Sequence, residues 1–82
     1  MVTAIKKIYT NSSSVTFDCN GVAIIGNGEF RAISGKLDGF ILYSDTLHYE
    51  NGEKLSRNEK ENLKSLYQQF ILNNEDFIDW DI

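Results

Sequence analysis

The chain has 82 residues, with twelve acidic side chains against eight lysines and arginines and a formal net charge of −4. A chain of this length forms one domain, residues 1–82, and its apolar and aromatic content excludes intrinsic disorder. Its basic residues are too few and too dispersed to release many counterions. We therefore expect no direct binding to nucleic acid or to an anionic membrane.

The composition also indicates where the protein works. Cys19 is the only cysteine, so no internal disulfide can form, and this fits a reducing compartment. Residues 1–7 contain no apolar run long enough for a signal peptide, and no segment approaches a membrane span. We expect a cytoplasmic protein.

The first part of the chain predicts an antiparallel hairpin. A first strand is expected over Val2–Tyr9, and Val15–Cys19 then alternate apolar and polar side chains with the period of a half-buried strand. Asn20-Gly21 follows directly. Because both central residues of a type I′ turn need positive φ, this dipeptide predicts a tight turn, with Val22–Ile25 as the returning strand.

The next segment predicts further strands separated by turns. Strands are expected over Glu29–Ser34 and Phe40–Tyr43, and Thr46–Tyr49 is expected as an edge strand or an extended lead-in. The connections are expected at Gly26-Asn27-Gly28, at Gly35–Gly39 and at Ser44-Asp45, where glycine or short polar residues interrupt the apolar runs. These strands continue the antiparallel arrangement into a meander.

One helix is predicted from Ser56 to about Leu72. Ser56 and Glu59 have the spacing of a capping box, in which each side chain binds the other residue's amide. Apolar side chains then recur at helical spacing and form one stripe, made of Leu63, Leu66, Tyr67, Phe70 and Ile71. The opposite side is polar, so the helix should pack on a sheet. Asn73-Asn74 is expected to end it, because asparagine tolerates the left-handed conformation.

The last residues alternate strictly between apolar and acidic side chains. Ile78, Trp80 and Ile82 share one parity, so we expect a terminal strand or extended arm that lays Ile78 and Trp80 on the core. The predicted fold class is α+β: an antiparallel β-meander of five to six strands, with one amphipathic helix packed on a face and a short C-terminal strand.

Catalytic chemistry finds little support in the sequence. Cys19 and His48 are single residues of their type, and no third group or oxyanion site is indicated beside them. We expect Cys19 in the core and His48 on a surface strand. No metal, cofactor or catalytic residue is predicted, and the protein is expected not to be an enzyme. An enzyme would require an unforeseen pocket in which Glu50, Glu53 and His48 converge.

Acidic side chains are concentrated at the C-terminal end, where no basic residue follows Lys64. Two interpretations stay open: a solvated chain end, and a patch of acidic and aromatic residues that attracts a basic protein partner. The candidate partner-binding residues are Tyr49, Glu50, Glu53, Glu75, Asp76, Asp79, Trp80 and Asp81.

About a third of the chain suggests a family. Gly35–Tyr43, Ser44–Tyr49 and Leu55-Ser56 with the following Glu/Lys-rich helix resemble small immunity proteins of bacterial polymorphic-toxin and contact-dependent inhibition systems. Those are short, mostly β proteins with a helix near the carboxyl end. The resemblance implies a non-catalytic inhibitor that neutralises a cognate toxin by binding, and many such toxins are nucleases with basic active sites.

A second hypothesis comes from the residues alone. The protein would be a small self-associating structural or phage accessory domain, in which the exposed edge of the sheet pairs with another copy. A homo-oligomer is therefore the alternative to a complex with a basic toxin.

Overall fold

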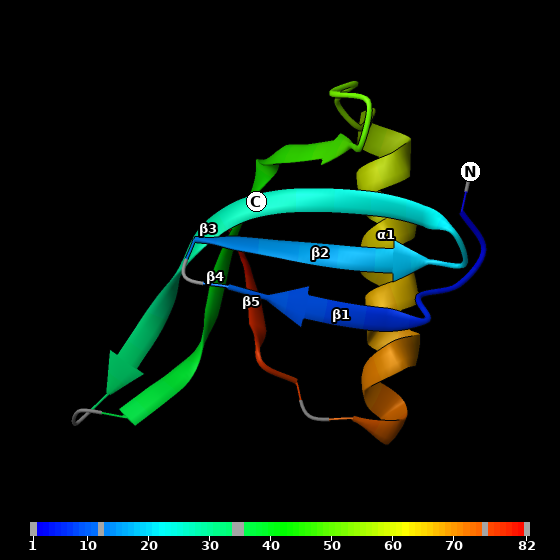
Figure 1. Ribbon diagram of the computed structural model, residues 1–82. Coiled ribbons are helices and arrows are strands. Elements are labelled where there is room, and N and C mark those ends of the chain that lie inside the picture. The colour runs from blue at the N-terminus through cyan, green and yellow to red at the C-terminus, as the bar shows by residue number, and fades with distance from the viewer. Residues whose placement is uncertain (1, 12, 34–35, 75, 82) are drawn as a thin grey trace.

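A computed structural model of the protein describes residues 2–11, 13–33, 36–74 and 76–81 (Figure 1). Its strands are β1 (Lys7–Thr10), β2 (Ser14–Cys19), β3 (Val22–Ile33), β4 (Lys36–Tyr49) and β5 (Ile78–Asp81). Its helices are α1 (Arg57–Phe70) and the short 3-10 helix η1 (Ile71–Asn73). The predicted α+β fold, with one helix and a short C-terminal strand, is confirmed.

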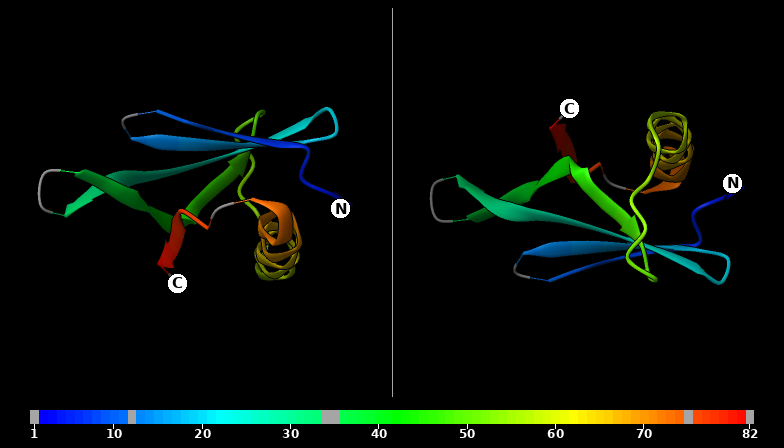
Figure 2. Two further views of the ribbon diagram at one scale, coloured as in Figure 1. Left: turned by 90° about the horizontal axis from the view of Figure 1, so that it is seen from below. Right: turned by 90° about the horizontal axis from the view of Figure 1, so that it is seen from above.

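The strands form one sheet in the order β1-β2-β3-β4-β5. The first four are antiparallel neighbours in sequence, which is the predicted meander, whereas β5 runs parallel to β4. A parallel neighbour needs a crossover connection, and α1 provides it. The sheet is strongly curled, and α1 lies on its concave side (Figure 2).

The β2-β3 hairpin forms as the sequence predicts. Asn20 and Gly21 have φ values of 57° and 95°, and Cys19 and Val22 face each other across the turn. The first strand, in contrast, is shorter than predicted. It begins at Lys7, while Val2 and Ile5 pack their side chains against the edge of the core without joining the sheet.

The predicted turn at Gly26-Asn27-Gly28 is wrong, because β3 continues through these residues to Ile33. Glycine serves a different purpose here. A Cβ atom on Gly28 would collide with the carbonyl oxygen of Ile41 in β4, so the two backbones approach too closely for a side chain. The strand expected over Glu29–Ser34 is therefore the second part of β3, which ends at Ile33, and Ser34 lies outside the described residues.

The predicted turn at Ser44-Asp45 is also wrong as a boundary between strands, because β4 is one strand with a bulge. Between the pairs Ile25–His48 and Asn27–Tyr43, Gly26 alone lies opposite Ser44–Leu47. The Thr46 hydroxyl closes the bulge by donating to the Tyr43 carbonyl at 2.5 Å and accepting from the Asn27 amide at 2.8 Å. Of the connection expected over Gly35–Gly39, Gly35 lies outside the described residues and the rest belongs to β4.

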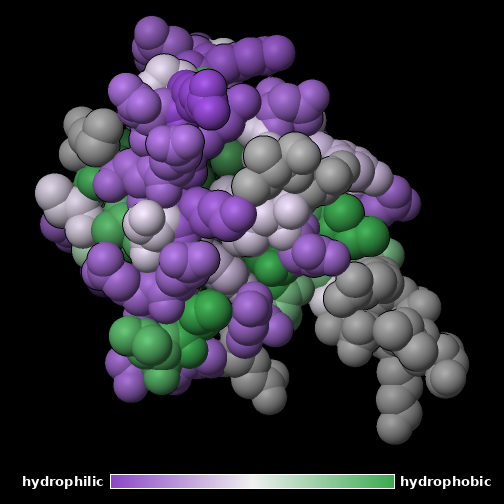
Figure 3. All heavy atoms as spheres, turned by 180° about the vertical axis from the view of Figure 1, so that it is seen from behind, coloured by the Kyte–Doolittle hydropathy of each residue, from purple (hydrophilic) through white to green (hydrophobic). Residues whose placement is uncertain are grey.

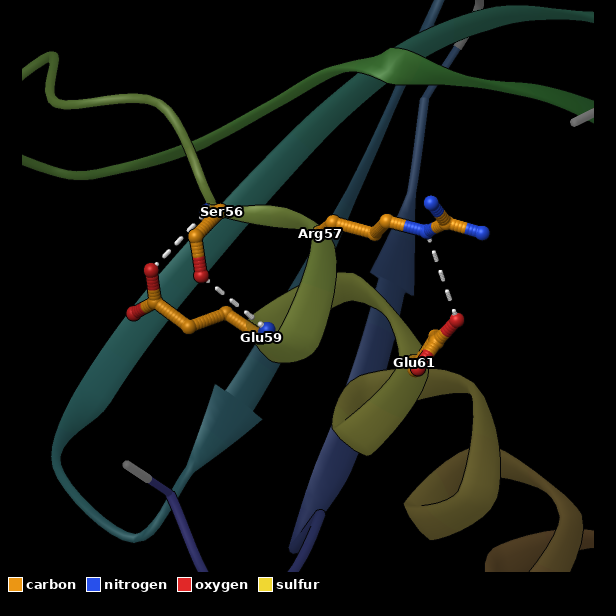
Figure 4. A network of polar contacts seen from close by, with 4 residues as sticks. All are labelled: Ser56, Arg57, Glu59 and Glu61. Carbon is orange, nitrogen blue, oxygen red and sulfur yellow. Dashed lines mark hydrogen bonds and ion pairs between the residues drawn. The ribbon is translucent and has the colours of Figure 1, made fainter.

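The start of α1 matches the prediction. The Ser56 hydroxyl accepts from the Glu59 amide at 3.3 Å, and the Ser56 amide donates to the Glu59 carboxylate at 2.9 Å (Figure 4). The expected left-handed asparagine at the other end is wrong, because the chain leaves α1 through η1 and Asn74 is extended, with φ −141°. The Asn74 side chain instead donates to the Phe70 carbonyl at 2.9 Å.

The core lies between α1 and the concave side of the sheet. From α1 it receives Leu63 and Tyr67, and the strands with their flanking segments supply Val15, Phe17, Cys19, Ile24, Phe40, Leu42, Leu47, Leu55 and Ile78. The opposite side of α1 faces solvent, and the surface on this side of the molecule is mainly hydrophilic (Figure 3). Phe70 and Ile71, at the end of the predicted stripe, are half-buried.

Candidate functional site

The predicted partner-binding residues fall into two groups. Tyr49, Glu50 and Glu53 lie around the turn between β4 and α1, at the top of Figure 1. The others belong to the C-terminal segment, which enters the sheet beyond the opposite end of α1: they are Asp76, Asp79, Trp80 and Asp81. Glu75 lies outside the described residues. The structure therefore does not bring the candidates together on one surface.

Tyr49 connects its turn to the first turn of α1. Its half-buried hydroxyl donates to the Glu59 carboxylate, the same group that caps the helix. This hydrogen bond, followed by desolvation, raises the pKa of Tyr49 to about 12, and it lowers the pKa of Glu59. Tyr49 thus has an internal role in positioning the helix start.

Asp76 also has an internal role. It accepts from the hydroxyl of Tyr67 at 2.7 Å, and the oxygen of that hydroxyl accepts from the amides of Phe77 and Ile78 at 3.2 and 3.1 Å. Burial, and then the hydrogen bond to Asp76, raise the pKa of Tyr67 to about 12. The cluster fixes the point at which the chain enters β5.

Asp79 lies on the side of the sheet that α1 does not cover, here called the open face. Ile41 is paired with Glu29 on β3 and with Asp79 on β5, so the three residues form one row across the sheet. Glu29 and Asp79 are exposed, and Ile41 is half-buried. Tyr43 is half-buried two positions along β4, and its hydroxyl donates to Glu29. Asp81 occupies the strand position beside Tyr43.

Trp80 has the opposite orientation and packs on the core, as predicted from its parity. Its ring stacks on Phe17 at 5.8 Å between centroids and lies 5.7 Å from the ring of Tyr67. The indole nitrogen is buried and has no hydrogen-bond partner among the residues that the structure describes.

A hollow of about 320 Å³ lies between α1 and β5, and we call it the α1–β5 hollow. Its lining combines one aromatic ring with mainly charged side chains: Ser44, Arg57, Lys60, Glu61, Lys64 and Trp80. Sequence reasoning missed this cluster because other residues separate its basic side chains along the chain. Their helical spacing was the available signal, since residues three and four apart share a helix side.

Cys19 and His48 lie on opposite sides of the sheet. Cys19 lies in the core, as predicted, and is 3% exposed, and burial followed by the charge of Asp18 raises the pKa of its thiol to about 11. His48 pairs with Ile25 on the open face, and its Nδ1 lies 2.8 Å from the Thr46 carbonyl oxygen. Within the described part of the chain, no group of three or more His, Cys, Asp or Glu side chains is arranged to hold a metal.

Comparisons of this chain with protein-family models, with characterised proteins and with solved structures find no match. None of the helices in the described residues is long and apolar enough to cross a membrane.

Proposed function

We propose that the protein is a non-catalytic cytoplasmic inhibitor that binds a basic protein partner through the open face, in the manner of an immunity protein that neutralises a toxin. The observation that carries this proposal is the row Glu29–Ile41–Asp79, in which an apolar side chain of β4 lies between two exposed carboxylates on the flanking strands β3 and β5. An apolar centre with a charged rim is the usual composition of a protein interface.

The neighbouring contacts favour rigid presentation of this surface. The hydrogen bond between Tyr43 and Glu29 joins β4 to β3 and restricts both side chains before a partner arrives. Less conformational entropy is then lost on binding. Tyrosine is also enriched among the residues that dominate interface energies. The net charge of −4 adds long-range attraction for a basic partner and would increase the association rate.

Two other surfaces have less support. The turn that carries Glu50 and Glu53 is next to Tyr49, but the Tyr49 hydroxyl binds Glu59 of α1 and therefore restrains neither of these two carboxylates. Self-association through the free edge of β1 is disfavoured, because this strand has four residues and begins with a lysine. Short strands and lysine are devices that prevent edge pairing.

The test is isothermal titration of the protein with the product of the adjacent gene at low ionic strength. The expected result is a nanomolar or tighter complex that weakens as salt is added, because exposed charges are screened. An unrelated basic protein of similar charge is the control and should bind far more weakly. Absence of binding to the neighbouring gene product would remove the proposal.

Variants then locate the surface. The double substitution Glu29→Gln and Asp79→Asn should weaken binding roughly tenfold or more, mainly through slower association. Asp45→Asn removes an exposed charge elsewhere on β4 and is the matched control. If Glu50→Gln with Glu53→Gln had the larger effect, the partner would bind the turn and the open face would be excluded.

A further inference from the structure

We infer that the α1–β5 hollow is a binding site for a small organic anion, with a carboxylate or phosphate group on a flat apolar body. This inference does not depend on the proposed inhibitor function. Trp80 and Asp79 are adjacent residues of β5 and point to opposite sides of the sheet, so the hollow and the open face are separate surfaces.

The charge of the hollow is the first argument. Three of the eight basic residues of an acidic protein, Arg57, Lys60 and Lys64, line this one space. Glu61 is the acidic side chain in the lining, and its carboxylate lies 3.7 Å from the Arg57 side chain, where both are well exposed. An anion between the lysines would gain charge-assisted hydrogen bonds, which are stronger than neutral ones.

The state of the two lysines is the second argument. Lys60 and Lys64 are half-buried and form no ion pair with the residues that the structure describes. Two like charges one turn apart on a helix repel each other, which destabilises the free protein slightly. A bound anion removes this repulsion, so the site gains affinity from a feature that folding alone does not favour.

Trp80 supplies the apolar part of the site. Its ring lines the hollow and is held by stacking on Phe17, so a flat ligand would meet a rigid aromatic wall. The volume of about 320 Å³ suits a small molecule.

The test uses the fluorescence of Trp80, which is the only tryptophan of the chain. The protein is titrated at constant, low ionic strength with sodium benzoate, phenyl phosphate, inorganic phosphate and benzylammonium chloride. Benzoate and benzylammonium have a similar shape and opposite charge. We expect saturable changes in emission with millimolar dissociation constants for benzoate or phenyl phosphate, weaker binding of inorganic phosphate, and no saturable change with benzylammonium.

The matched variants are Lys60→Gln with Lys64→Gln, and Lys54→Gln as a control on the exposed turn before α1. The double variant keeps Trp80 and should weaken binding of the aromatic anion by roughly tenfold or more, while the control should bind like the parent. The double variant should melt at the temperature of the parent or slightly above it, because it removes the repulsion between the two lysines, and the control should melt like the parent.

Four results would overturn the inference. They are a linear response to both aromatic anions, an equal response to benzylammonium, equal loss of binding in the Lys54 control, and binding of inorganic phosphate as tight as that of phenyl phosphate. The two aromatic anions show which anionic group the site prefers. Tighter binding of benzoate would assign the site to carboxylates, and tighter binding of phenyl phosphate would assign it to phosphate esters.

Discussion

The hydroxyl of Tyr67 donates to the carboxylate of Asp76 at 2.7 Å, and this contact joins the buried side of α1 to the segment that leads into β5. The same oxygen accepts from the amides of Phe77 and Ile78. One side chain therefore satisfies the backbone at the point where the parallel strand begins. Asp76, which the sequence suggested as a partner-binding residue, is held by this contact.

Tyr67→Phe should lower the free energy of unfolding by about 1–3 kcal/mol, because two backbone amides and a carboxylate lose their hydrogen-bond partner while the ring is kept. Urea denaturation measures the change. Tyr9→Phe is the control, since Tyr9 is 50% exposed, and it should change stability by less than about 0.5 kcal/mol. Equal stability of Tyr67→Phe and the parent would show that β5 does not depend on this cluster.

Ser56→Ala should lower stability by about 1 kcal/mol, because the Glu59 amide loses the hydroxyl that caps it and the capping box is broken. Ser65→Ala is the matched control, since Ser65 is exposed within α1 and alanine is the better helix former there. Thermal melting of the two variants should separate them clearly. Indistinguishable melting temperatures would place the helix start elsewhere.

The Tyr49–Glu59 hydrogen bond should make stability depend on pH at both extremes. Because the pKa of Glu59 is lowered in the folded protein, this group stabilises the fold above its ordinary pKa of 4.5, and the stabilisation is lost as the pH falls below that value. Because the pKa of Tyr49 is raised, this group stabilises the fold below its ordinary pKa of 10, and the stabilisation is lost as the pH rises from 10 towards 12. The stability difference between the parent and Tyr49→Phe, from urea denaturation, should therefore be constant between these limits and shrink beyond them.

Tyr49→Phe isolates this contact because all other titrating groups are common to both proteins. A difference that stayed constant through both limits would mean that Tyr49 and Glu59 do not share a hydrogen bond in solution. If the stability difference between the parent and Tyr49→Phe shrank only at high pH, the Glu59 carboxylate would be bound by the Ser56 amide and not by Tyr49.

Local sequence signals predicted the parts of the fold that adjacent residues determine. Asn20-Gly21 specifies its turn through the φ values that those two residues adopt, and Ser56 with Glu59 specifies the start of α1 through hydrogen bonds over one helical turn. Neither signal requires knowledge of distant residues.

The role of the glycine-rich stretch Gly26-Asn27-Gly28 depends on residues that are distant in sequence, so local signals did not predict it. Gly26 and Gly28 have the composition of a turn, but their role is set by Ile41, Leu42 and Leu47 of β4, which pack too closely for a side chain on β3. The sequence does not show which strand will lie opposite. Glycine indicates a special backbone requirement in both cases, and only the tertiary fold distinguishes a turn from a close approach.

Of the two candidate surfaces, the sequence predicted the orientation of the β5 side chains but not the α1–β5 hollow. The alternation at the C-terminal end correctly places Trp80 towards the core, and the register sets Asp79 on the open face. The α1–β5 hollow could not be predicted, because it requires the crossover that brings β5 beside the helix. Lys60 and Lys64 are ordinary solvent-face residues of a helix until Trp80 lies next to them.

Leu63→Ala and Phe70→Ala test how far the core extends along α1. Leu63 is fully buried, so Leu63→Ala should lower the free energy of unfolding by about 2–5 kcal/mol. Phe70 is half-buried at the last turn, so Phe70→Ala should cost less although it removes more atoms. The two are ranked by the denaturant concentration at the midpoint of unfolding. The reverse order would extend the core to the end of the helix.

Gly28→Ala tests the close approach of β3 and β4. The added methyl group would meet the Ile41 carbonyl oxygen, and because a backbone atom of a paired strand cannot move aside alone, the cost should be about 1–3 kcal/mol or more. Gly26→Ala should cost less, since its Cβ would lie 2.5 and 2.9 Å from methyl groups of Leu42 and Leu47, which can change rotamer. Asn27→Ala, between them and exposed, is the control and should change stability by less than about 0.5 kcal/mol. If Gly28→Ala unfolded at the same urea concentration as Asn27→Ala, the two strands would lie further apart at Gly28 than the structure shows.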